Sequence, residues 1–88
     1  MHEFSLIQDL MKKIVAIARD HEAQKVVTVR VKLGALCHIS AEHFGEHFAD
    51  ASAGTVAQGA RLEIEQSKDE TASDAQDILL QSVEVQTA

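Results

Sequence analysis

A change in hydrophobic period near the amino terminus constrains the fold of this chain most. From Phe4 to about Glu22 the apolar residues recur at the i, i+3, i+4 spacing of an amphipathic helix. Between Val26 and Leu33 the period becomes two, as in a half-buried strand. Val27, Val29, Val31 and Leu33 are expected on one side, and Thr28, Arg30 and Lys32 on the other. The sequence therefore predicts a helix followed closely by a strand.

A second helix is predicted after Gly34, which ends the strand pattern. Ser40 is a suitable amino-terminal cap, and the helix is expected to run to about Ser52. Phe44 and Phe48 lie one turn apart on it and supply two of the three aromatic side chains of the chain. With an aromatic fraction of only 3%, aliphatic side chains must fill most of the core.

Two more strands are predicted in the last third of the chain, beyond a turn region bracketed by Gly54 and Gly59. Apolar residues alternate with polar ones at 62–65 and again at 78–86. Residues 67–77 between them are acidic and small without an apolar period, as expected of a mobile surface loop. We therefore predict an α+β fold of one domain, residues 1–88, in the order α-β-α-β-β. Its three-stranded mixed sheet would carry both helices on one face.

Composition excludes several classes of function. The net charge is −6, and Lys and Arg are not clustered, which argues against binding to nucleic acid or an anionic membrane. No apolar run approaches the roughly 18 residues of a membrane span, and the start is unlike a secretory signal, so a cytoplasmic protein is expected. Cys37 is the only cysteine, which excludes an internal disulfide and a multi-cysteine zinc site. Composition leaves homo-oligomer formation open.

The first three residues, Met1, His2 and Glu3, form a candidate metal site. The α-amine, the backbone nitrogen of His2 and its imidazole could close two adjacent chelate rings on one ion. Such a flat, nitrogen-rich set suits Ni(II) or Cu(II), and the Irving–Williams order favours Cu(II). Taken alone, His2 can also be an ordinary exposed residue of a frayed terminus.

Other histidines offer a weaker metal signal. His43 and His47 are four residues apart on the predicted second helix, with Glu46 beside them, and their rings could share one face and bind a divalent ion. Because such pairs arise easily on a polar helix face, we favour solvent exposure for them. His21 is expected at the carboxyl end of the first helix, where a cationic ring favours the helix dipole.

No pattern in the chain predicts catalysis. Cys37 and His38 adjoin, but sequence neighbours rarely have the geometry of a nucleophile and its base, so a half-buried loop thiol is the preferred interpretation. The sequence contains no P-loop, dinucleotide fingerprint, nucleophile elbow or paired catalytic carboxylates. We do not expect an enzyme.

Taken in order, several segments of the chain resemble the HypA/HybF family of hydrogenase nickel-incorporation proteins. They are the start Met1-His2-Glu3 with Ser5-Leu6, His21-Glu22-Ala23 after the first helix, the strand from Val26 to Gly34, the segment from Gly54 to Glu65, and the segment from Leu80 to Val85. The resemblance implies an α-β-α-β-β fold and a nickel metallochaperone. Such a protein acts with a maturation GTPase to deliver Ni(II) to the precursor of a [NiFe]-hydrogenase large subunit, or in some bacteria to urease.

Carried over by residue, the resemblance assigns three nickel ligands at the start of the chain. Met1 would supply its amine, His2 its backbone nitrogen and ring, and Glu3 a neighbouring carboxylate or backbone donor. The fourth donor is left open between Glu3, a water and a residue of another subunit.

The chain departs from this family in one segment. Family members carry a zinc domain with two CxxC pairs between the last two strands, where this chain has the acidic loop 67–77, so no structural zinc is expected. The loss leaves an alternative function open. The chain could be a metal-independent interaction module that docks to the maturation GTPase, the hydrogenase precursor or a second copy of itself.

Overall fold

The secondary structure follows the predicted order. The computed structural model describes residues 2–37, 39–73 and 75–87, with side chains from Ser5 onward. Its elements are helix α1 (His2–Asp20), strand β1 (Ala23–Leu33), helix α2 (Ala41–Ser52), strand β2 (Arg61–Gln66) and strand β3 (Ile78–Thr87). The predicted α+β class and the order α-β-α-β-β are confirmed.

The sheet is mixed, with β1 in the centre and β2 and β3 at its two edges. β1 runs parallel to β2, with Val31 opposite Ile64, and antiparallel to β3, with Val29 opposite Val83. A parallel pair cannot be joined by a tight hairpin and needs a crossover, which α2 and its flanking turns supply. The second helix is therefore required by the pairing of β1 with β2.

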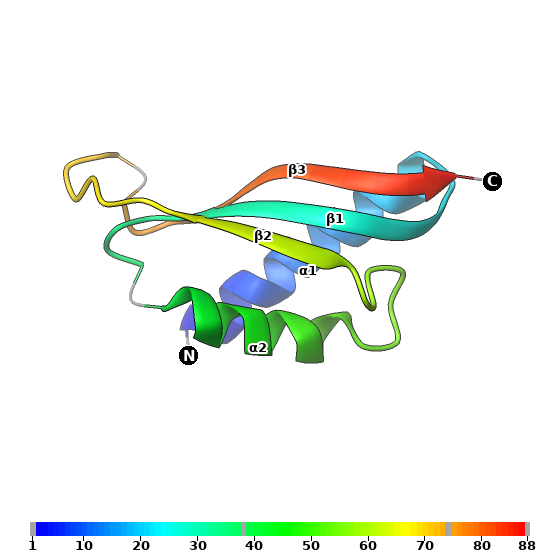
Figure 1. The fold of residues 1–88 in the computed structure, drawn as a ribbon, viewed down its shortest axis with the longest axis horizontal. Coiled ribbons are helices and arrows are strands. Elements are labelled where there is room, and N and C mark those ends of the chain that lie inside the picture. The colour runs from blue at the N-terminus through cyan, green and yellow to red at the C-terminus, as the bar shows by residue number, and fades with distance from the viewer. Residues whose placement is uncertain (1, 38, 74, 88) are drawn as a thin grey trace.

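Both helices pack on one face of the sheet and bury the core between the layers (Figure 1). Phe44 and Phe48 of α2 are buried with their rings stacked at a centroid distance of 6.4 Å. The rest of this core is aliphatic, as the composition predicted, and comes mainly from Ile7, Leu10, Met11, Ile14, Ala18, Val26, Val29, Val31 and Leu33. Among the described residues, no helix has the length and apolar character needed to cross a membrane.

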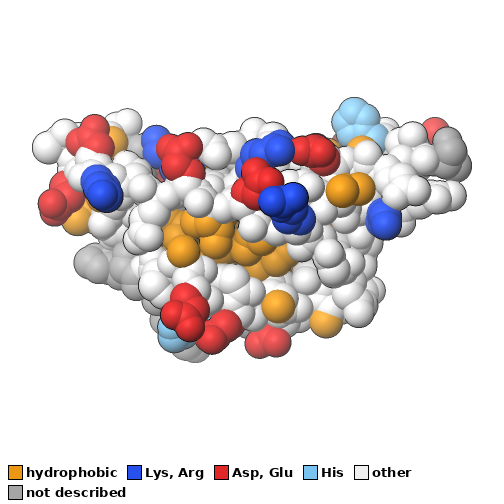
Figure 2. All heavy atoms as spheres, viewed as in Figure 1, with side chains coloured by type: hydrophobic (Ala, Val, Ile, Leu, Met, Phe, Trp, Pro, Cys, Tyr) orange, Lys and Arg blue, Asp and Glu red, His pale blue; other side chains and the backbone are white. Residues whose placement is uncertain are grey.

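The opposite face of the sheet is polar and is tied together by Arg30. Its Nε donates a hydrogen bond to Glu63 Oε1 at 2.8 Å, and its Nη2 lies 2.7 Å from Glu84 Oε1. The hydrogen bond to Glu63, followed in size by the hydrogen bond to Glu84, raises the pKa of Arg30 above its ordinary value. Charged side chains gather over the sheet in Figure 2, and a patch of hydrophobic side chains is visible between β2 and α2.

The alternation predicted for β1 is wrong at its start. Val27 was expected to share the buried side with Val29, but Val27 is 40% exposed, whereas Val26 is only 2% exposed. Thr28, which was expected on the polar side, is also buried, at 6% exposed. The register with β3 shifts between Val26 and Thr28, and such an irregularity exchanges the two sides of a strand. The Val26 N–H also donates to the Val56 carbonyl, at 3.0 Å, which holds this end of the strand against the α2–β2 turn.

The loop 67–77, which was predicted to be a mobile surface loop, is attached near its two ends to the end of β1. The Ser67 N–H donates to the Leu33 carbonyl at 2.9 Å, and the Gly34 N–H donates to the Asp77 carbonyl at 2.9 Å. Ala75 is only 4% exposed and accepts a hydrogen bond from the Leu36 N–H. The backbone groups of this loop thus make hydrogen bonds to the end of β1 and the residues after it, which a hydrophobic pattern cannot predict.

Candidate metal centre at the amino terminus

Helix α1 begins at His2, before the Phe4 at which the hydrophobic pattern begins, and ends at Asp20 instead of Glu22. The amphipathic pattern could not locate the start, because polar residues of a first turn carry no period. The first four N–H groups of a helix have no carbonyl partner within it. The backbone nitrogen of His2 therefore lies in a first turn where no intrahelical hydrogen bond occupies it.

The core holds the start of α1 in place. Ile7 and Leu10, one to two turns after His2, are 1% and 5% exposed and pack in the core beneath the sheet. Of the predicted site residues, Met1 lies outside the described residues, and His2 and Glu3 are described by their backbone only. The backbone of His2 and Glu3 thus belongs to the first turn of a helix that the core anchors.

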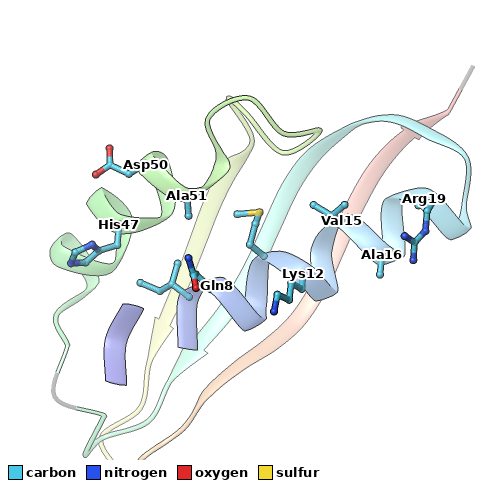
Figure 3. A pocket seen from close by; sticks show the side chains of 10 residues that line it. Gln8, Lys12, Val15, Ala16, Arg19, His47, Asp50 and Ala51 are labelled. Atoms are coloured by element: carbon cyan, nitrogen blue, oxygen red, sulfur yellow. The ribbon is translucent and has the colours of Figure 1, made fainter. Parts of the chain in front are cut away.

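A groove runs between α1 and α2 and begins about two turns beyond His2 (Figure 3). It has a volume of about 850 Å³ and an apolar floor that includes Ile7, Met11 and Val15. Gln8 and Lys12 of α1 and His47 and Asp50 of α2 stand along it. Sequence reasoning missed this groove, because it depends on how the two helices are placed and not on the pattern of either one.

The two histidines of α2 lie together. The ring centroids of His43 and His47 are 5.1 Å apart and the ring planes are tilted by 30°. The expected solvent exposure holds for His43, whereas His47 is half-buried and lines the groove. Within the described ranges, no three His, Cys, Asp or Glu side chains are grouped so that they could hold a metal ion.

The remaining candidates in the sequence have structural positions. Cys37 is half-buried against the core and its Sγ lies 3.7 Å from the Ile39 carbonyl oxygen, as expected for a loop thiol. His38 lies outside the described residues. His21 follows the end of α1, where its N–H donates to the Ile17 carbonyl and its side chain is exposed.

Similarity to a known family shows the class of protein to which the chain belongs. The family described as "Hydrogenase/urease nickel incorporation, metallochaperone, hypA" matches residues 1–77. The chain belongs to this family, and the resemblance noted in the sequence is confirmed.

Individual relatives agree with this assignment. The hydrogenase maturation factor HypA of Archaeoglobus fulgidus is 39% identical over 64 residues, which are 73% of this chain and 58% of that protein. The HypA of Nitrosospira multiformis is 39% identical over 67 residues, which are 76% of this chain and 58% of that protein. The chain thus matches a little over half the length of these curated relatives. The solution structure of the Ni metallochaperone HypA from Helicobacter pylori has the same fold, with a TM-score of 0.79, 19% identity and 98% coverage of both chains.

Proposed function

We propose that this chain is a nickel carrier for the maturation of hydrogenase or urease that binds Ni(II) through Met1, His2 and Glu3. The observation that carries the proposal is the Met1-His2-Glu3 start within a chain that belongs to a nickel-incorporation family. Curated relatives named hydrogenase maturation factor HypA support the same role. Under this proposal Ni(II) is cargo, and the chain is an accessory protein and not an enzyme.

The proposed ligands fit Ni(II) chemically. The α-amine of Met1, the deprotonated backbone nitrogen of His2 and the His2 imidazole supply three nitrogen donors in fused chelate rings, a set suited to flat coordination. The position of His2 in the first turn of α1 supports this role, since its backbone nitrogen has no intrahelical acceptor to give up. Glu3, a water or a residue of another subunit completes the set.

The role of carrier requires that the metal be released to partners. We propose that the maturation GTPase and the hydrogenase large-subunit precursor are these partners. Because all three nitrogen donors must lose protons before they bind, affinity for Ni(II) falls as the pH falls.

Nickel titration of untagged protein tests the amino-terminal site. Calorimetry and the visible spectrum of flat four-coordinate Ni(II) would be compared for the native start, His2→Ala and a version with one extra residue before Met1. We expect both altered proteins to lose the flat-site spectrum and at least about tenfold in affinity, since even outer-shell changes cost a metal site about 10–100-fold. His21→Ala, which removes an exposed histidine beyond the other end of α1, is the matched control and should bind as the native protein does. Equal flat-site spectra in all of these proteins would overturn the proposal.

A second candidate function is metal-independent docking. It is favoured by the two open edges, β2 and β3, and by the groove between α1 and β3, where Leu6 and Leu79 are each 36% exposed. Complementation of a strain that lacks its own nickel-incorporation protein separates the two functions. Hydrogenase maturation that proceeds as well with His2→Ala as with the native sequence would favour docking over nickel delivery.

A further inference from the structure

The imidazoles of His43 and His47 form a pair on α2 that lies outside the ligand set of the proposed function. The two residues are separated by four positions, so they lie one above the other on the same side of the helix. Their ring centroids are 5.1 Å apart with a tilt of 30°. In the part of the chain that the structure describes, neither ring takes part in a hydrogen bond or an ion pair, so none of the described groups competes for the ring nitrogens.

The orientation of this pair is fixed by the rest of α2. Phe44 and Phe48, each one residue after a histidine, are 0% and 3% exposed and anchor the neighbouring side of the helix, about 100° around its axis, in the core. The Ser40 hydroxyl accepts a hydrogen bond from the His43 N–H at 3.1 Å, which caps the helix at the first histidine. The backbone therefore holds the two imidazoles side by side before any ligand arrives.

The separation of the rings matches what one shared ion requires. With metal–nitrogen bonds of about 2.0–2.1 Å and each nitrogen about 1.1 Å from its ring centre, two imidazoles on one ion have centres about 4.5–5.2 Å apart for coordination angles of about 90–109°. The observed 5.1 Å lies within this range.

The charges on α2 itself favour a cation. This helix carries Glu42, Glu46 and Asp50 but no Lys or Arg, and Asp50 lines the groove with His47, whereas Lys12 and Arg19 line it from α1. Neutral imidazole is a ligand for Ni(II), Cu(II) and Zn(II), whereas Mg²⁺ and Ca²⁺ prefer oxygen donors.

We propose that His43 and His47 form a second metal site, which binds a divalent transition metal such as Ni(II), Cu(II) or Zn(II) by the two imidazoles. Because no third ligand is grouped with them among the described residues, water fills the other positions and the ion exchanges readily. The pair shares no residue with the proposed amino-terminal site, although Gln8, about 9 Å along α1 from His2 at 1.5 Å per residue, lines the same groove as His47.

The test uses a parent chain in which the amino-terminal site is removed by His2→Ala and one extra residue before Met1. Titration of this parent with NiCl2 in a calorimeter is expected to give one site per chain. His43→Gln and His47→Gln should each lower the affinity by at least about tenfold, since even the loss of an outer-shell partner costs a metal site about 10–100-fold. The control His43→Gln with Ala49→His keeps two histidines on the helix but places them at 47 and 49, and residues two apart do not face each other. It should bind as weakly as His43→Gln, whereas His21→Gln should bind as the parent does.

Amide NMR spectra recorded during the Ni(II) titration locate the ion. Ni(II) held by two imidazoles and water is paramagnetic, so amide NMR signals around residues 43–47 should broaden before those of α1. Absence of Ni(II) binding by the parent, or equal affinity in the parent and the control with the histidines two residues apart, would overturn the proposal. These results would leave the amino-terminal site untouched, since that site is absent from every protein in this series.

Discussion

Gly45 lies between the two histidines and makes α2 less stable than alanine would at the same position. Glycine in a helix interior costs about 0.5–1 kcal/mol relative to alanine, because it loses more backbone freedom on folding. A Cβ at Gly45 would meet no atom within 4 Å, so the substitution brings no clash. We expect Gly45→Ala to raise the free energy of unfolding by about 0.5–1 kcal/mol in urea denaturation. Gly54→Ala, at a φ of +79°, should lower it, and an equal effect at both positions would contradict this explanation.

Glu22 presents the opposite case just beyond α1. Its φ is +53°, in the left-handed region, where a residue with a Cβ is disfavoured by roughly 1–2 kcal/mol. Glycine commonly occupies this place after a helix. We expect Glu22→Gly to raise the free energy of unfolding by up to about 1 kcal/mol, because the entropy that glycine adds to the unfolded chain offsets part of the relieved strain. Glu22→Ala, which removes the same charge but keeps a Cβ, is the matched control. Equal gains from Gly and Ala would point to charge and not to the backbone.

Among the elements, β1 shows how far a sequence pattern reaches. Alternation correctly predicted a strand and the buried positions Val29, Val31 and Leu33, because each residue type reports its own side of the sheet. It failed at Val26 and Val27, where both residues are valine and nothing in their chemistry indicates which one faces the core, and at Thr28, which is buried although its hydroxyl indicated the polar side. The irregular pairing with β3 and the hydrogen bond to Val56 decide the matter, and both are contacts between segments far apart in the sequence.

The attachment of the loop 67–77 to the end of β1 leads to a prediction for that element. Ala75 is 4% exposed, so Ala75→Asp would bury a carboxylate without a partner. We expect it to lower the free energy of unfolding by about 1–3 kcal/mol, the usual cost of an unsatisfied buried polar group. Gln76→Asp, at an exposed neighbour, introduces the same side chain and should change stability by less than about 0.5 kcal/mol. Similar small effects at both positions would mean that the loop is not held against the sheet in solution.

For the whole molecule, the candidate sites differ in how much of them sequence alone can predict. The proposed amino-terminal set could be named from three consecutive residues, because its chelate rings would be closed by neighbours in the chain. The histidine pair on α2 could be suspected from spacing, but the 5.1 Å separation and the half-buried position of His47 required the packed helix. The groove was out of reach, since it arises only when α1 and α2 are placed together.

The same difference predicts how nickel affects the stability of the whole chain. A ligand stabilises a fold only when it binds the folded state better than the unfolded one, by about 2.7 kcal/mol at a concentration of 100 times Kd when it binds the folded state alone. The amino-terminal donors remain neighbours after unfolding, whereas His43 and His47 face each other only while α2 is formed. We therefore expect Ni(II) to raise the Tm of the parent without an amino-terminal site.

The reciprocal protein provides the control for this prediction. With a native start and the pair removed by His43→Gln and His47→Gln, thermal denaturation followed by circular dichroism should give nearly the same Tm with and without Ni(II). A rise in Tm in this protein as large as that in the parent would contradict the assignment of the stabilising site to α2.

The hydrogen bonds at the two ends of the loop 67–77 also bear on how this domain tolerates change. Ser67 bonds to Leu33, the last residue of β1, and Asp77 bonds to Gly34, the residue after it. Ser67 directly follows β2 and Asp77 directly precedes β3, and these two strands flank β1 on either side. At a spacing of about 4.8 Å between strands, the two anchors are about 10 Å apart. Each doubling of a connecting loop adds only about 0.6 kcal/mol of closure cost. A segment of almost any length could therefore leave and rejoin the domain here while the helices and the sheet keep their places.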